Sequence, residues 1–222
     1  MADSEPTLAV IGGTGALGSG LAWRWARAGY GIIIGSRSAE NAATAAAKLA
    51  ERAPGAEIRG LENGQAASEA DIVVLTVPFA NHRPMLEAVR DGAQGKILVD
   101  ATVPLVPPKV ARVQLPPEGS AAKAAQEFLG DGVQVVSAFQ NVAADLLQEE
   151  DAEIACDVLV CGNKRDARQT VVDMATAAGL TAWHAGPIDN SAAAEALTSV
   201  LIFLNRGALT HAGIRITGEP KA

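Results

Sequence analysis

The sequence predicts an α/β protein with a Rossmann-type, doubly wound and mostly parallel sheet. Short apolar runs alternate with helical stretches along the 222 residues, a glycine-rich turn follows the first run, and a second run follows at βαβ spacing. The length suits one domain with a small extension. We expect a Rossmann domain over 1–150. An extension over 151–222 continues its sheet and ends in a helix, so that the two form one compact unit.

The first turn carries the motif Gly13-x-Gly15-x-x-Gly18, between a strand predicted over 7–11 and a helix predicted over 17–28. Gly13 is expected to permit the tight turn, Gly15 to let the backbone approach a pyrophosphate, and Gly18 to let the helix pack closely. The helix N-terminus offers free N–H groups to phosphates. We therefore expect a dinucleotide to contact Gly13, Thr14, Gly15, Ala16 and Leu17.

The end of the second predicted strand, over 32–34, indicates which dinucleotide binds. A carboxylate at this point would hold the ribose 2′-OH of NAD and repel a 2′-phosphate. The chain has Gly35 there, followed by Ser36 and Arg37, whose hydroxyl and guanidinium can both hydrogen-bond a phosphate. Ser36 and Arg37 therefore predict NADP(H), and make residues 1–150 an NADP-binding domain. The alternative is an arginine that is merely solvated on a turn.

Further elements follow in order. Ligands of parallel sheets lie beyond the carboxyl ends of the strands, so Thr76, Val77 and Pro78, after the fourth strand, are expected against the cofactor. Strands are predicted over 57–60, 71–75, 96–100, 134–136, 157–161 and 180–183. Helices are predicted over 41–53, 62–70, 84–91, 120–129, 165–178 and 192–206.

A second ligand is expected beyond the fifth and sixth strands. The proline-rich stretch 105–120 cannot form a regular helix or an inner strand, and it either covers a site or is a solvated connection. For Phe139, core packing is the alternative to ligand contact, and Asn141 can instead cap a helix. The residues expected at this second site are Thr102, Val103, Pro104, Leu105, Ser137, Phe139, Gln140 and Asn141.

Composition excludes several classes of function. A formal net charge of -7 argues against a broad nucleic-acid or membrane-surface footprint. Cys156 and Cys161 are expected to be reduced and buried, with no disulfide and no metal site. His82, His184 and His211 lie outside any hydrolytic-triad pattern and are expected in loops or at the surface. Because residues 1–5 lack a signal-peptide pattern and no stretch is apolar enough to span a bilayer, we expect a cytoplasmic protein.

Together these motifs resemble the NADPH-dependent reductases of the deazaflavin coenzyme F420. The similarity lies in 12–22, in the strand ends at 34–37 and 71–78, and in 136–138, 160–162, 185–190 and 195–198, with 185–198 the most distinctive segment. It implies a compact Rossmann enzyme that binds NADP and exchanges hydride with F420. Hydride transfer between stacked rings needs mainly alignment and exclusion of water, and no catalytic acid or base is identified.

The chain departs from the family pattern at two positions. Gln140 replaces a histidine on the second-substrate side, and Asn41 replaces a lysine that helps to hold the 2′-phosphate. The acceptor therefore stays open between F420 and another flavin, a quinone or an imine. A regulator that binds NADP without turnover is a further alternative. The stripe Leu197, Leu201 and Leu204 packs on its own sheet or on a second subunit, and a homodimer is plausible.

Overall fold

The computed structural model describes residues 5–150 and 152–218 and has eight strands in one sheet. The expectation about a signal peptide depends on residues 1–4, which lie outside the described residues. The strands are β1 (Thr7–Ile11), β2 (Gly31–Ser36), β3 (Ile58–Glu62), β4 (Ile72–Leu75), β5 (Ile97–Asp100), β6 (Gln134–Ser137), β7 (Val158–Gly162) and β8 (Ala182–Gly186). All eight predicted strands are present, with bounds shifted by a few residues.

Seven α-helices accompany the strands. They are α1 (Ala16–Arg27), α2 (Ala39–Arg52), α3 (Asn63–Glu69), α4 (His82–Val89), α5 (Ala121–Leu129), α6 (Arg165–Ala177) and α7 (Ser191–Arg206). Short 3₁₀ helices are η1 (Phe79–Asn81), η2 (Leu146–Gln148) and η3 (Ile188–Asn190). Within the described residues, no helix is long and apolar enough to cross a membrane.

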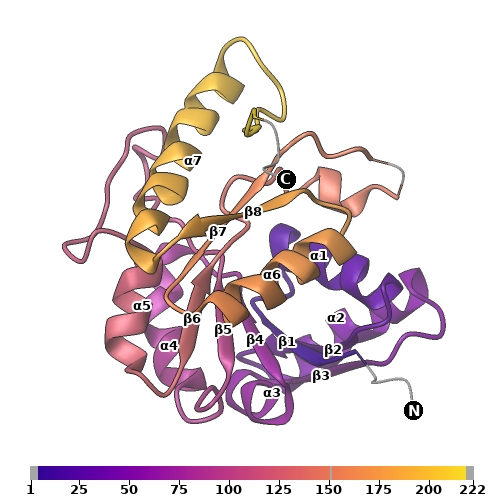
Figure 1. Ribbon diagram of the computed structural model, residues 1–222. Coiled ribbons are helices and arrows are strands. Elements are labelled where there is room, and N and C mark those ends of the chain that lie inside the picture. Colours follow the sequence, from indigo (N-terminus) through magenta and orange to yellow (C-terminus); the bar gives the residue numbers. More distant parts are fainter. Residues whose placement is uncertain (1–4, 151, 219–222) are drawn as a thin grey trace.

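The strand order is β3-β2-β1-β4-β5-β6-β7-β8, and only the β6–β7 pair is antiparallel. This confirms the predicted, mostly parallel Rossmann-type sheet. A parallel neighbour needs a crossover, usually a helix. The described residues between β6 and β7, 138–150 and 152–157, contain η2 and turns but no α-helix, and β7 accordingly runs back along β6. The last two strands thus continue the sheet in the opposite direction (Figure 1).

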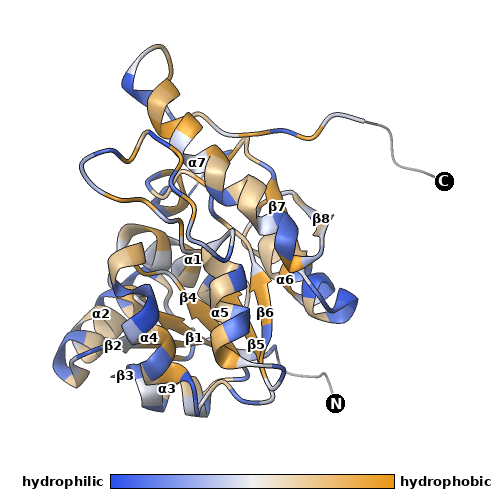
Figure 2. Cartoon of the chain, turned by 90° about the vertical axis from the view of Figure 1, so that its left-hand side faces the viewer, coloured by the Kyte–Doolittle hydropathy of each residue, from blue (hydrophilic) through white to orange (hydrophobic). Residues whose placement is uncertain are grey.

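Two helical layers cover the sheet. Along β1, Leu8 and Val10 face a cluster with α1, α2 and α6, while Ala9 and Ile11 face a second cluster with α3, α4 and α5. This alternation explains why the inner strands are apolar on both faces. Figure 2 shows the apolar strands between helices whose outer sides are hydrophilic.

The last helix, α7, extends away from the layers. Ser191, Ala194 and Glu195 near its start are buried, whereas Phe203 near its end is 66% exposed. Residues 101–120 contain no helix or strand, as predicted, and run beside α7 (Figures 1 and 2). In the predicted stripe, Leu201 is buried within the chain and Leu204 is exposed.

Candidate cofactor pocket and carboxyl-edge cluster

The turn between β1 and α1 forms one wall of a pocket. Gly12 has a φ of +83°, and a Cβ there would lie 2.7 Å from the carbonyl oxygen of Thr76. Only glycine adopts this conformation without strain. Gly13 lies in the same turn, as predicted, and a Cβ there would lie 2.9 Å from Val10 O, so the turn requires Gly12 in addition to Gly13.

The other two glycines have the contacts that the motif predicts. A Cβ on Gly18 would collide with Thr76 Oγ1, so Gly18 permits the close packing of α1 on the strands. Gly15 has Gly12 O, at 3.4 Å, as the nearest neighbour of an added Cβ. Gly15 also begins α1 as its N-cap, and no side chain caps this helix end. The first N–H groups of α1 are therefore available to a phosphate.

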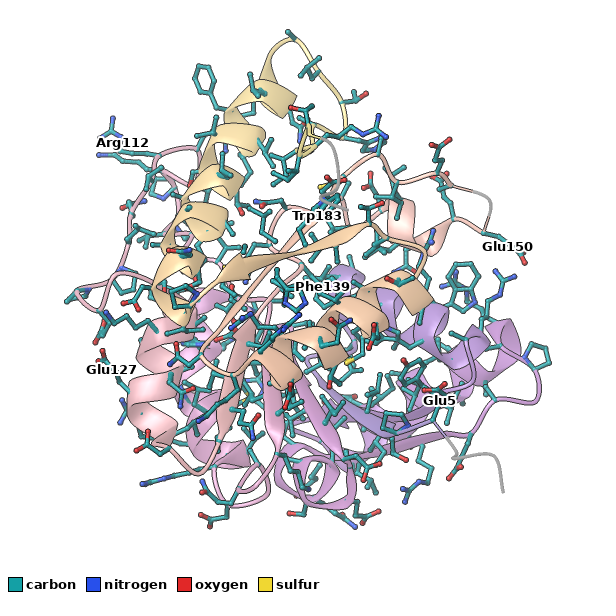
Figure 3. The ribbon with its side chains drawn as sticks, viewed as in Figure 1. Glu5, Arg112, Glu127, Phe139, Glu150 and Trp183 are labelled. Atoms are coloured by element: carbon teal, nitrogen blue, oxygen red, sulfur yellow. The ribbon has the colours of Figure 1, made fainter. Side chains whose placement is uncertain are left out.

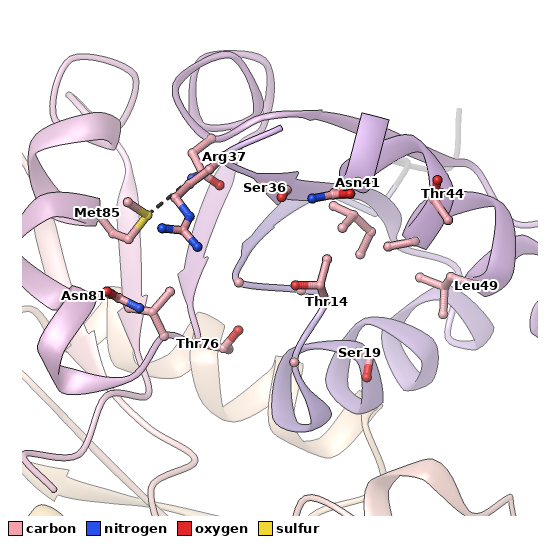
Figure 4. Close-up of a pocket in the computed structure, with 18 of the residues that line it drawn as sticks. Thr14, Ser19, Ser36, Arg37, Asn41, Thr44, Leu49, Thr76, Asn81 and Met85 are labelled. Atoms are coloured by element: carbon pink, nitrogen blue, oxygen red, sulfur yellow. Dashed lines mark hydrogen bonds between the residues drawn. The ribbon is translucent and has the colours of Figure 1, made fainter. Parts of the chain in front are cut away.

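The pocket has a volume of about 680 Å³ at the carboxyl end of β1, β2 and β4. It contains eight of the predicted cofactor residues, while Ala16 and Leu17 fall outside its lining. Figure 4 shows Thr14, Ser36, Arg37 and Thr76 around the same space. The lining residues are Gly12, Gly13, Thr14, Gly15, Ser19, Ile34, Gly35, Ser36, Arg37, Asn41, Thr44, Ala45, Lys48, Leu49, Arg52, Asn63, Thr76, Val77, Pro78, Asn81 and Met85.

The charge of this lining is positive. It includes Arg37, Lys48 and Arg52 but no aspartate or glutamate, in a chain whose formal net charge is -7. Arg37 is exposed and makes no hydrogen bond or ion pair within the described residues. Its neighbour Ser38 caps α2 by accepting a hydrogen bond from Asn41 N at 3.3 Å. The pocket thus suits a ligand with several phosphate groups.

None of the residues expected at the second site lines this pocket. Gln140 Nε2 donates to Asp100 O at 2.8 Å and to Ser137 Oγ at 2.9 Å. Asn141 Nδ2 donates to Ala194 O in α7 at 2.9 Å, so it does not cap a following helix. Thr102 Oγ1 is buried and has no hydrogen-bond partner among the described residues. Contact of this group with a substrate stays a prediction.

Phe139 lies in the core. It is 1% exposed, and its ring meets that of Trp25 edge-on at 5.7 Å between centroids. Figure 3 shows it in the interior of the molecule. This burial favours the core-packing alternative. Its φ of 74° is in the left-handed region, which non-glycine residues adopt only under strain.

A buried ionic pair lies beside these residues, and it corrects one expectation. His184 and His211 are exposed, but His82 is buried, with Nε2 2.7 Å from Asp100 Oδ2. Burial lowers the pKa of His82, but the charge and hydrogen bond of Asp100 outweigh it, so the pKa is raised overall. The other oxygen, Asp100 Oδ1, accepts from Thr102 N at 2.9 Å.

A third buried ionisable group, Glu195, comes from α7. Its carboxyl oxygens accept from Ala121 N at 2.6 Å and Ala122 N at 3.1 Å, at the start of α5. Burial raises the pKa of Glu195 to about 8 and the charge of Asp100 adds to this, whereas the two N–H donors and His82 lower it. The cluster of His82, Asp100 and Glu195, called here the carboxyl-edge cluster, joins α4, β5 and α7.

Comparison with known proteins identifies the family. Residues 7–104 match the family model described as "NADP oxidoreductase coenzyme F420-dependent". The chain is 42% identical over 222 residues to the F420-dependent NADP reductase of Methanothermobacter thermautotrophicus, covering 96% of each chain. It is 41% identical to the enzyme of that name from Methanocaldococcus jannaschii, covering 95% of this chain and 97% of the relative. The chain belongs to the F420-dependent NADP reductase family.

A solved structure supports the fold independently. A crystal structure of a protein from Arthrobacter sp. FB24 has a TM-score of 0.80 at 23% identity, and the alignment covers 96% of this chain and all of that one. This likeness concerns the fold alone. Because the alignment covers 96% of this chain, the shared fold includes nearly the whole chain.

Sequence reasoning missed several residues of both sites. Lys48 could have been found, because it follows Asn41 by seven residues and so lies on the same face of α2. Asp100 was visible as a charge at the end of an apolar strand. The burial of His82 and Glu195 depends on the packing of α4 and α7 and has no local signal.

Within the described residues, no group of three or more His, Cys, Asp or Glu could hold a metal ion.

Two alanine substitutions distinguish the roles of the motif glycines. Gly18→Ala is expected to reduce the free energy of unfolding by about 1–3 kcal/mol, because its Cβ collides with Thr76 Oγ1 and with the backbone of Gly12 and Gly13. Gly15→Ala is expected to change stability less but to weaken NADPH binding, because its Cβ occupies the space of the pyrophosphate. Thermal melting and calorimetric titration measure the two effects. Equal stability losses, or unchanged binding in Gly15→Ala, would contradict these roles.

The raised pKa of Glu195 predicts how stability depends on pH. Between its ordinary value of 4.5 and about 8, the folded state binds a proton that the unfolded state has released. Stability therefore falls as pH rises through this range, and His82, whose pKa is also raised, adds to the fall above its ordinary value of 6.5. The melting temperature is expected to be higher at pH 6 than at pH 8.5.

Glu195→Gln is expected to flatten this pH dependence, while lowering stability at pH 6 by removing one acceptor of a buried N–H. Glu127→Gln, on the exposed side of α5, is the matched control and should keep the slope of the parent protein. A slope that persists in Glu195→Gln would show that another group causes it.

Proposed function

We propose that the protein transfers hydride between NADP(H) and coenzyme F420. The observation that carries the proposal is the 42% identity, over 96% of both chains, to an enzyme named F420-dependent NADP reductase. The pocket supports it, because its walls combine the glycine turn, a free helix N-terminus and three cations without any acid. These features fit the pyrophosphate and the 2′-phosphate of NADP(H).

The residues have distinct tasks in this proposal. The turn from Gly13 to Gly15 and the N–H groups at the start of α1 bind the pyrophosphate, and Ser36 and Arg37 bind the 2′-phosphate. Residues 76–78 hold the nicotinamide end. Residues 102–105 and the polar residues of 137–141 border the deazaflavin ring. NADPH, F420 and one proton give NADP⁺ and reduced F420, and the chain contributes alignment and exclusion of water.

A spectrophotometric assay tests the activity. With NADPH and purified F420, we expect the deazaflavin absorbance to be lost, and NADH to support a much slower loss. Absorbance that persists while NADPH is bound would contradict the proposal. Reduction of another flavin, a quinone or an imine would then identify a different acceptor, which Gln140 in place of histidine leaves open. Binding without turnover on any of these would indicate an NADP-sensing regulator.

The exposed end of α7 supports a proposal about assembly. Val200, Phe203 and Leu204 are exposed there, and the loop 101–120, which runs beside α7 in Figure 2, exposes Val106, Val113 and Leu115. Exposed apolar groups of this kind mark interfaces, and small soluble proteins most often pair with a copy of themselves. We therefore propose a homodimer that covers this surface.

A cytoplasmic location fits the two free, buried cysteines.

Light scattering coupled to size exclusion tests the homodimer. The protein is expected to elute with twice the mass of one chain. Phe203→Asp places a charge at the centre of the surface and should give the mass of a single chain, while the apolar control Phe203→Leu should stay dimeric. A wild-type protein that is monomeric at all concentrations would refute the proposal.

A further inference from the structure

Part of the pocket is a groove between α1 and α2 that several polar side chains line. Asn41, Ala45, Lys48 and Arg52 line it at intervals of four, three and four residues, which places them on one face of α2. Ser19 of α1 lines it from the other side. Figure 4 shows Ser19, Asn41 and Thr44 around this part of the pocket, next to Ser36. The groove is therefore continuous with the end of β2.

Of the two cations in this groove, Arg52 is engaged by the protein. Its guanidinium donates to Gln148 Oε1 at 2.7 Å and to Gln148 O at 2.8 Å. It also stacks over the ring of Trp23, with 4.4 Å from its carbon to the ring centroid. These contacts hold α2 against α1 and η2. The guanidinium of Arg52 is therefore already bonded within the protein and less available to a ligand.

Lys48 is not engaged in this way. It is exposed and has no hydrogen bond or ion pair within residues 5–150 and 152–218. Side chains on a helix lean toward its N-terminus, so a lysine at this position has Thr44 and Asn41, which also line the pocket, on the side toward which it leans. A cation held in a groove without any acid has no partner until an anion binds.

We propose that Lys48 binds the 2′-phosphate of NADP(H) and determines, with Arg37, the preference for NADP(H) over NAD(H). The inference rests on the proposed function and adds a residue to its cofactor site. Arg37 and Lys48 enter the pocket from different elements, the loop after β2 and the third turn of α2. A doubly charged phosphate between them would satisfy both cations and accept from Ser36.

Calorimetric titration with two adenosine probes tests this without any turnover. Adenosine 2′,5′-bisphosphate carries the 2′-phosphate and adenosine 5′-monophosphate lacks it. Lys48→Ala is expected to weaken binding of the bisphosphate on the order of tenfold, as for loss of one charge-assisted contact, and to leave the monophosphate within about twofold. Lys48→Arg should retain most of the preference. Lys164→Ala, an exposed lysine outside the pocket, should change neither affinity.

The variant Arg37→Ala separates the possible failures. If Arg37→Ala reduces the preference for the bisphosphate while Lys48→Ala does not, the role of Lys48 is overturned and the NADP site stands. Equal weakening of both probes by Lys48→Ala also overturns it, because the effect is then not on the 2′-phosphate. If the parent protein does not prefer the bisphosphate at all, the cofactor part of the proposed function fails as well.

Discussion

A buried carboxylate at the end of β5 holds the carboxyl edge of the sheet together. The Asp100 side chain is 0% exposed, and it contacts His82 from α4 and the N–H of Thr102, while its carbonyl oxygen accepts from Gln140 in the loop after β6. A charge is tolerated in the interior only when it is paired and hydrogen-bonded. Asp100 can therefore be buried only when α4, the loop after β5 and the loop after β6 are positioned so that their hydrogen bonds to it form.

Glu195 extends this constraint to α7. It binds the start of α5, and Asn141 and Thr198 join α7 to the loop after β6. Burial, together with the charge of Asp100, raises the pKa of Glu195 to about 8, because the two N–H donors and His82 do not offset it. The C-terminal helix is thus held by buried polar contacts at its start, while its far end is left exposed.

The sequence predicted those parts of the molecule that depend on local signals. Each of these signals lies within a few adjacent residues. The strands form where they were predicted, and the glycine turn, Ser36 and Arg37 line one pocket. Features that depend on distant packing were missed. The burial of His82 is decided by β5, which follows it in the chain, and Glu195 is buried by α5. The need for glycine at Gly12 as well as at Gly13 was missed, because adjacent glycines give the same sequence signal and only the backbone geometry assigns the positive φ to Gly12.

The two halves of the proposed active site differ in how they are built. The cofactor half uses backbone N–H groups and exposed cations, which are available until a ligand binds. At the other half, the amides of Gln140 and Asn141 are already bonded within the protein. The loop that carries them includes Phe139 at a φ of 74°, a strain of about 1–3 kcal/mol that its packing against Trp25 offsets. Polar groups engaged in this way can fix the shape of a surface but have little freedom to transfer a proton. These two amides are therefore better suited to aligning a ring than to acid–base chemistry.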